Sequence, residues 1–102
     1  MKIMNIQALM KQAQNLQKDM LKAKEEIDNM VFTGTSSFVS VEVKGTKEIL
    51  KVTIDNDDIN SDDKEMIEDM LVIAINDAFK QVDKVTEQKM GKFSNMMPGG
   101  LF

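Results

Sequence analysis

Apolar residues in the first third of the chain recur at alternating intervals of three and four residues. The series comprises Ile6, Leu9, Ala13, Leu16, Met20, Ala23, Ile27 and Met30. This heptad-like period places all of these side chains along one face of a single helix, which we expect over residues 5–30. A helix of that length presents more apolar surface than a 102-residue chain can cover by itself. The pattern therefore predicts a partner, most simply a second copy of the same chain.

The composition excludes several function classes. A chain of 102 residues makes a single domain with a modest core. It has no Cys and no His, which rules out disulfides, thiolate or imidazole catalysis, and zinc sites built from those residues. No nucleophile stands beside a candidate base in any known motif, so we expect no enzymatic activity, metal, cofactor or small-molecule substrate.

Nothing in the sequence indicates a membrane protein. There is no long apolar run, whereas a spanning helix needs about 20 consecutive apolar residues. The first 14 residues interrupt their apolar positions with Gln and Asn, unlike the core of a signal peptide. We therefore expect a cytoplasmic chain without a membrane partner.

The net charge of −4 is unevenly distributed along the chain. Residues 1–24 carry +4, residues 25–79 carry −10 and residues 80–102 carry +2. A local field depends on where charges lie, so the basic ends can meet a polyanion although the whole chain is acidic. All 13 basic residues are Lys, a point charge suited to phosphate rather than to the bidentate contact that reads guanine.

Three lysines lie on the face of the first helix opposite the apolar series. Lys11, Lys18 and Lys22 fall within about 40° of one another at 100° per residue. Such a stripe is most often only a solvated helix face, and the alternative is a surface for phosphate groups. The residues alone leave both interpretations open.

Residues 31–55 change to β-branched side chains with a period of two. Apolar and polar residues alternate over 39–44 and again over 50–55. Gly45, within the stretch Lys44–Lys47, predicts a hairpin turn between these strands. The segment predicts a small antiparallel meander with one apolar face, covered on that side only.

The acidic loop 55–63 precedes the second helix. A residue of the stretch 60–62 is suited to cap that helix, because Asn, Ser and Asp side chains accept from free N–H groups. Four side chains also match positions of a calcium-binding loop: Asp58, Asn60, Asp62 and Asp69. Asp63 stands where such a loop requires Gly, so capping is the favoured interpretation.

Residues 63–90 predict the second helix. Its apolar face comprises Ile67, Leu71, Ala74, Ala78, Val82 and Val85. Residues 70–75 are apolar nearly all round, and in so small a chain a helix that needs cover on more than one side is shared between subunits. We predict a dimer interface formed by Met66, Met70, Val72, Ile73 and Ile75. Residues 91–102 lack periodicity and predict a mobile tail.

Several longer motifs follow one another in a recognisable order. They are Leu9-Met10-Lys11-Gln12-Ala13-Gln14, Val41-Glu42-Val43-Lys44-Gly45, Val52-Thr53-Ile54-Asp55, Asp63-Lys64-Glu65-Met66-Ile67-Glu68-Asp69-Met70, Ala74-Ile75-Asn76-Asp77-Ala78 and Met97-Pro98-Gly99-Gly100. On these motifs the sequence resembles the YbaB/EbfC family of small bacterial nucleoid-associated proteins over nearly its whole length. One departure is the stretch Thr35-Ser36-Ser37-Phe38, where the family often has a glycine-rich segment.

The resemblance implies an α+β fold of order α-β-β-β-α, with a small antiparallel sheet and two long terminal helices. It also implies an intertwined homodimer with the sheets at its centre and paired helices projecting as arms. This dimer would bind duplex DNA in the nucleoid with weak sequence preference and perform no catalysis. Lys11, Lys80 and Lys84 match positions suited to DNA contact. Charge and helix face alone add Lys18, Lys22, Lys89 and Lys92.

A second function stays open on the residues themselves: a dimeric protein-interaction adaptor or chaperone-like scaffold. The chain has 10 Met, a residue suited to adaptable binding surfaces, and several lie in the second helix. The acidic middle also fits a protein partner better than it fits DNA. For nucleic acid, duplex is favoured over single strands, because all five aromatic residues are Phe and no exposed row of them offers a stacking platform.

Overall fold

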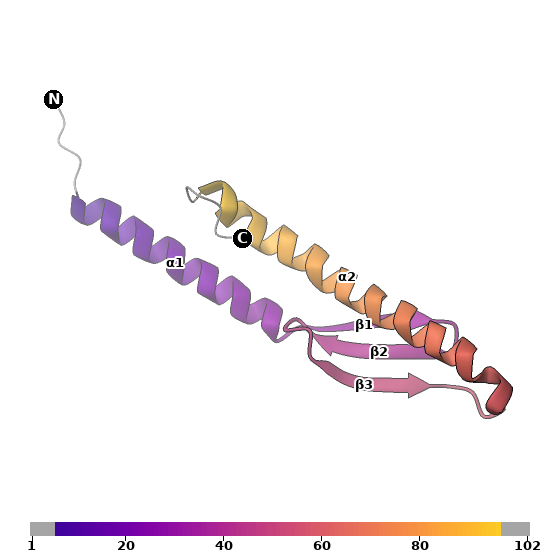
Figure 1. Ribbon diagram of the computed structural model, residues 1–102. Coiled ribbons are helices and arrows are strands. Elements are labelled where there is room, and N and C mark those ends of the chain that lie inside the picture. Colours follow the sequence, from indigo (N-terminus) through magenta and orange to yellow (C-terminus); the bar gives the residue numbers. More distant parts are fainter. Residues whose placement is uncertain (1–5, 97–102) are drawn as a thin grey trace.

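The computed structural model describes residues 6–96 of the chain. Its elements in order are α1 (Ile6–Asp28), β1 (Val31–Ser36), β2 (Val39–Lys44), β3 (Ile49–Ile54), the 3-10 turn η1 (Ser61–Asp63) and α2 (Lys64–Met96). The predicted α+β class and the order α-β-β-β-α are confirmed. The molecule is elongated, 78 × 20 × 13 Å, because both helices run beyond the same end of the sheet (Figure 1).

The three strands form the predicted antiparallel meander, in the spatial order β1-β2-β3. Between β1 and β2 the chain turns at Ser37, whose φ of 54° lies in the left-handed region that glycine adopts most easily. Ser37 belongs to the stretch Thr35-Ser36-Ser37-Phe38, at which the YbaB/EbfC family, as noted above for the resemblance, often has a glycine-rich segment. The predicted hairpin turn around Gly45 is confirmed by the N–H of Lys44, which donates to the carbonyl oxygen of Glu48 at 2.9 Å.

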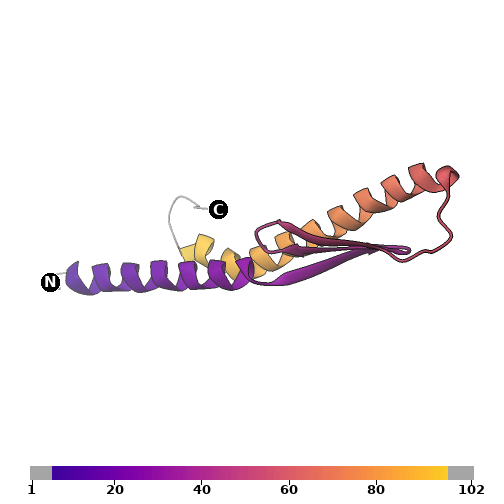
Figure 2. The ribbon, with the colours of Figure 1, turned by 90° about the horizontal axis from the view of Figure 1, so that it is seen from below.

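The core lies between α2 and the first two strands. Figure 2 shows α2 running along one face of the sheet, where it packs on β1 and β2. The apolar side chains of β2 and of the predicted helix face are buried there: Val39, Val41, Val43, Ala74, Ala78 and Val82. Gly34 of β1 permits this close approach, because a Cβ at that position would lie 2.0 Å from the carbonyl oxygen of Ala74.

The second helix is capped as predicted and runs further than predicted. Asn60 caps η1 with its side chain, which accepts from the N–H of Asp62 at 2.9 Å. The N–H of Asn60 in turn donates to the Asp63 carboxylate at 3.2 Å, a reciprocal capping box. The helix continues through Gly91 to Met96 rather than ending at residue 90, so the first part of the predicted tail is helical. Residues 97–102 of that tail lie outside the described residues.

The apolar series of α1 has a partner within the same chain over its second half. Ile27 is buried against Met90 and Phe93 of α2, and Leu16, Met20 and Ala23 pack against this cluster. The prediction that a second copy is the likeliest partner was therefore incomplete, since α2 continues far enough to cover these positions. Ile6 and Leu9, in the first turns of α1, stay 70% and 42% exposed in the single chain.

The predicted apolar face of the third strand is not covered by α2. The register pairs Val41 with Val52 and Val39 with Ile54, so these residues of β3 share the face on which α2 lies. Yet all six residues of β3 are exposed, because α2 crosses this face over β1 and β2 and does not extend over β3 (Figure 1). The expectation of a fully covered sheet face thus holds for β1 and β2 but not for β3.

Candidate nucleic-acid interface

The lysine stripe of α1 faces away from α2. The apolar series faces α2 through Leu16, Met20 and Ile27, so Lys11, Lys18 and Lys22 lie on the outer side of the helix. All three are exposed, and within residues 6–96 none of them forms an ion pair. At 1.5 Å per residue the stripe is about 16 Å long. These ammonium groups are therefore available to an anionic partner.

The lysines of α2 fall into two environments. Lys80 and Lys84 are exposed, one turn apart, on the part of α2 that lies over the sheet. Lys89 lies further along, where its ammonium is 3.7 Å from the carboxylate of Glu26 on α1. The ammonium of Lys92 lies 5.0 Å from the ring centre of Phe93, a cation–π distance.

We call α1 together with residues 85–96 of α2 the arm. Of the seven lysines predicted as DNA contacts, five lie on the arm and two on the body. Those on the arm are Lys11, Lys18, Lys22, Lys89 and Lys92. The structure thus gathers residues from both ends of the sequence on one projection.

One contact within the arm was missed by sequence reasoning. Glu26 and Lys89 belong to different helices, far apart in the sequence, so no i, i+4 spacing signals their meeting. The two side chains are 54% and 41% exposed, and an exposed pair of this kind contributes little to stability. Its effect is instead on the local charge, since Glu26 offsets one of the arm's lysines.

One cluster of acidic residues lies at the end of the molecule opposite the arm tip. The loop 55–63 joins β3 to η1 at that end (Figure 1), and Glu65 follows in the first turn of α2. At the base of the arm, Asp28 pairs with Lys24 at 3.4 Å. Within residues 6–28 and 85–96 the arm carries six lysines and also five acidic residues, so its basic character is concentrated in the stripe on the outer face of α1.

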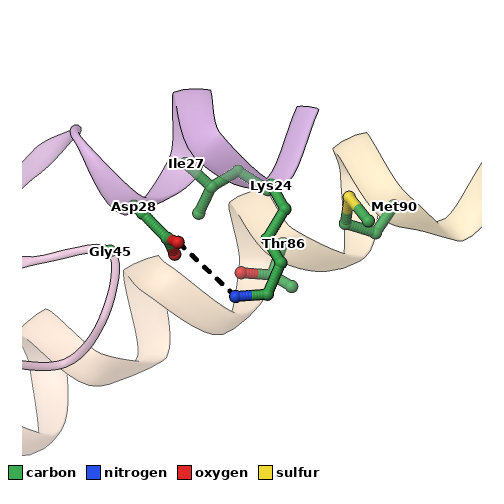
Figure 3. A pocket seen from close by; sticks show the side chains of 6 residues that line it. All are labelled: Lys24, Ile27, Asp28, Gly45, Thr86 and Met90. Atoms are coloured by element: carbon green, nitrogen blue, oxygen red, sulfur yellow. Dashed lines mark hydrogen bonds and ion pairs between the residues drawn. The ribbon is translucent and has the colours of Figure 1, made fainter. Parts of the chain in front are cut away.

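A cavity of about 180 Å³ lies where the arm joins the body. Figure 3 shows its lining by Lys24, Ile27, Asp28, Gly45, Thr86 and Met90. The lining is mainly apolar, and Lys24 and Asp28 are paired with each other at its rim. Residues 6–96 contain no group of His, Cys, Asp or Glu side chains arranged to hold a metal ion. The cavity marks the junction of arm and body and assembles no chemical site.

The residues predicted to form a dimer interface differ in their environment. Met70 and Ile75 pack against the chain's own core and are only partly exposed. Met66, Val72 and Ile73 are 42%, 58% and 56% exposed. In the single chain these three therefore leave apolar surface open on α2.

A three-stranded antiparallel sheet with two long helices, exposed lysines on a projecting arm and an acidic loop at the far end define a small α+β protein of order α-β-β-β-α. The chain belongs to the YbaB/EbfC DNA-binding family, whose model matches residues 1–97. Its fold, its order of elements and its motifs agree with that membership. Between residues 6 and 96, none of the helices has the length and apolarity to cross a membrane.

Similar proteins agree with the family assignment. A nucleoid-associated protein of Lactococcus lactis subsp. cremoris is 46% identical over 98 residues, which cover 94% of this chain and 99% of that protein. A nucleoid-associated protein of Ligilactobacillus salivarius is 40% identical over 101 residues, covering 97% of each chain. The crystal structure of an uncharacterized protein from Helicobacter pylori superimposes with a TM-score of 0.69 at 26% identity, covering 93% of this chain and all of the other.

Proposed function

We propose that this protein is a homodimeric, non-enzymatic nucleoid-associated protein that binds duplex DNA with weak sequence specificity through its lysine-bearing arms. Its place of action is the nucleoid, within the cytoplasm. The observation on which this depends is the exposed stripe of Lys11, Lys18 and Lys22 on the outer face of α1, free of ion pairs within residues 6–96. The chain's membership of a DNA-binding family and the names of its relatives, which are called nucleoid-associated proteins, support this proposal.

The chemistry of lysine accounts for the weak specificity. An ammonium group neutralises phosphate and releases condensed counterions, which contributes affinity without reading the base sequence. The chain's 13 basic side chains are all Lys, so the planar guanidinium fork with which Arg reads guanine is absent. Preference among DNA sites then rests on duplex shape and deformability.

The burial of the aromatic side chains supports duplex rather than single-stranded DNA as the proposed partner. Phe32 and Phe93 are buried, and Phe38 and Phe79 are partly buried against the core. Bases of a single strand need exposed rings on which to stack. The part of the chain described here offers lysines for a backbone and no row of rings for bases.

The homodimer is supported by the apolar surface that the single chain leaves open. Val72 and Ile73 are more than half exposed on α2, and Ile6 is 70% exposed on α1. A dimer removes part of this surface from water and doubles the set of candidate lysines from seven to fourteen. If six to ten phosphates are engaged, affinity falls by about three to five orders of magnitude between 50 and 200 mM salt.

The test is a band-shift titration of a long duplex at low and moderate salt. We expect the wild-type protein to bind at low salt and the Lys11→Glu, Lys18→Glu, Lys22→Glu triple variant to bind at least 100-fold more weakly. Equal binding of the triple variant would show that the stripe is only a solvated helix face. Light scattering gives the mass in the same buffer, and a stable 11.5 kDa species would contradict the homodimer.

One observation favours a second function, a protein-interaction adaptor or chaperone-like scaffold. Met66, Val72 and Ile73 expose apolar surface on α2, and a flexible Met side chain suits variable partners. Binding through such a surface is nearly insensitive to salt, whereas binding to phosphate weakens steeply. A salt titration of any partner complex therefore separates the two functions.

A further inference from the structure

A small apolar cluster, which we call the arm seam, joins the two helices of the arm. It consists of Ile27 of α1 and of Met90 and Phe93 of α2, which are 3%, 5% and 3% exposed. Further residues of α1, Met20 among them, pack against it. An ion pair also crosses between the helices, but both of its side chains are exposed, so it contributes little to stability. The contact of α1 with the last turns of α2 therefore depends mainly on the arm seam.

Met90 is buried, yet a cavity lies beside it. The cavity of about 180 Å³ at the junction of arm and body is lined by Met90, and Figure 3 shows its thioether among the other lining side chains. About 10–15 Å³ of such space is enough to hold one water molecule, so the cavity has room for a small oxidant such as hydrogen peroxide. The exposed Lys24 forms part of the lining. The cavity assembles no catalytic or metal site, but it gives small molecules access to a sulfur atom in the arm seam.

The polar groups that line this cavity are already engaged. The Thr86 hydroxyl donates to the carbonyl oxygen of Val82 at 2.8 Å, and the N–H of Gly45 donates to a carbonyl oxygen of the link between α1 and β1 at 3.0 Å. The ammonium of Lys24 is paired with a carboxylate. An oxygen atom added to the sulfur of Met90 would therefore lie in an apolar contact without a free hydroxyl or amide to donate to it. Burial of such an unpaired polar atom is unfavourable, which favours separation of the helices.

We propose that Met90 is a site of reversible oxidation by peroxides, and that its sulfoxide releases α1 from the last turns of α2. Oxidation converts a flexible apolar side chain into a polar one, and sulfoxide reductases reverse the change. Met90 thus serves as an oxidation-sensitive latch between the two helices of the arm. This inference concerns the packing of the arm and does not depend on what the arm binds.

The chemical step is the transfer of one oxygen atom to the thioether. The sulfur lone pair attacks one oxygen of hydrogen peroxide, so that an S–O bond forms as the O–O bond breaks. The hydroxide that leaves takes the proton of the transferred hydroxyl and becomes water. The sulfur is oxidised by two electrons and the peroxide is reduced by two, which gives the sulfoxide and one molecule of water.

Other methionines of the chain provide an internal comparison. Met10 and Met66 are 57% and 42% exposed, so peroxide reaches them first, but neither belongs to the arm seam. The chain has no cysteine, so peroxide does not form thiol products that obscure the result. We expect the Met10 and Met66 sulfoxides to appear early without a change in the arm, and loss of packing to follow the appearance of the Met90 sulfoxide.

The test treats the full chain with hydrogen peroxide and compares two variants. Met90→Leu removes the sulfur and keeps an apolar side chain of similar volume, a replacement that cores tolerate. Met66→Leu, also on α2 but outside the arm seam, is the matched control. Peptide mass spectrometry locates each added oxygen, and hydrogen exchange measures the protection of the amides in residues 16–27 of α1. Circular dichroism before oxidation checks that each variant folds.

We expect amide exchange over residues 16–27 to accelerate at least about tenfold in the oxidised wild-type protein and in oxidised Met66→Leu, because a helix without a packing partner is marginal in water. Oxidised Met90→Leu should keep its protection. Treatment of the oxidised wild-type protein with sulfoxide reductases for both epimers should restore protection. This reversal tests the latch even without the Met90→Leu variant.

Three results would overturn the proposal. If Met10 and Met66 are fully oxidised while Met90 stays a thioether, the cavity does not admit the oxidant. If the Met90 sulfoxide forms and the protection of α1 is unchanged, the sulfoxide does not release the helix. If oxidised Met90→Leu loses protection as the wild-type protein does, another methionine, such as Met20, is responsible. None of these results bears on whether the arm binds DNA, so they leave the proposed function untouched.

Discussion

Gly45, in the turn between β2 and β3, lies directly against the backbone of Ile27 in the last turn of α1. A Cβ at residue 45 would stand 1.8 Å from the Ile27 carbonyl oxygen. The N–H of Gly45 donates to the carbonyl oxygen of Met30 at 3.0 Å, and the N–H of Met30 donates to that of Ile27 at 3.0 Å. The turn therefore holds the base of α1 against the sheet and sets the direction of the arm.

Replacement of Gly45 should disturb this junction. Because the obstacle to a Cβ is backbone rather than a flexible side chain, we expect Gly45→Ala to lower the free energy of unfolding by about 1–3 kcal/mol. For a domain of this size each kcal/mol corresponds to a Tm change of about 4–8 °C. Thermal unfolding measures the loss.

Gly91 provides the matched control. It lies within α2, and a Cβ there meets nothing within 4 Å. Since glycine in a helix interior is less favourable than alanine by roughly 0.5–1 kcal/mol, Gly91→Ala should raise the Tm slightly. An unchanged Tm of Gly45→Ala would show that the backbone around Gly45 and Ile27 shifts to accommodate the Cβ without loss of stability, and would contradict the prediction.

Neutralising the outer stripe of α1 should change the salt dependence of DNA binding. Each phosphate contact contributes about 0.9 to the slope of log affinity against log salt. In a dimer, Lys11→Gln, Lys18→Gln, Lys22→Gln removes six lysines, so the magnitude of the slope should fall by up to about 5. Lys47→Gln is the control, because Lys47 pairs with Asp83 on the body at 2.8 Å and its loss should leave the slope nearly unchanged. A slope equal to that of the wild-type protein would place the phosphate contacts elsewhere.

Removal of the Glu26 charge should strengthen DNA binding. This carboxylate lies 3.7 Å from the ammonium of Lys89, so Glu26→Gln frees one lysine of the arm and removes an adjacent negative charge. We expect affinity for duplex DNA to rise about threefold to tenfold at low salt, while the stability changes by less than about 1 kcal/mol because the pair is exposed. Anisotropy titrations with labelled duplex measure the gain. A loss of affinity would indicate that Glu26 positions Lys89 for its contact.

The side chains that cover the edge of β1 should limit aggregation. Asp77→Ala with Gln81→Ala removes two hydrogen bonds to the backbone of Thr35 and Thr33, each contributing about 0.5–1.5 kcal/mol. We expect a lower Tm and slow, concentration-dependent assembly, since the freed groups can pair with another strand. Asn76→Ala, at an exposed position of the same helix, should show neither effect. Light scattering during prolonged incubation distinguishes the variants.

Local patterns predicted most of the fold because each buried position follows the period of its element. The alternation of Val39, Val41 and Val43 placed these residues on the covered face, and all three are fully buried. A cap was predicted within residues 60–62 because short polar side chains stand just before a run of helix formers, and the structure places it at Asn60. Local signals of this kind depend only on residues a few positions apart.

The errors concern contacts between distant segments. The extension of α2 to Met96 was missed because Gly91 breaks the apolar pattern without breaking the helix. That extension brings Met90 and Phe93 against Ile27, a contact that no spacing within α1 predicts. For the same reason the open edge of β3 could not be foreseen, since its exposure depends on which strands α2 covers.

The helix α2 belongs to both the body and the arm, without interruption over its 33 residues. At 1.5 Å per residue it is about 50 Å long. Its first part is anchored to β1 through Asp77 and Gln81, and its last part extends beyond the sheet (Figure 2). Because one unbroken helix joins the arm to the sheet, the direction of the arm is set by the contacts of α2 with β1 rather than by a flexible linker.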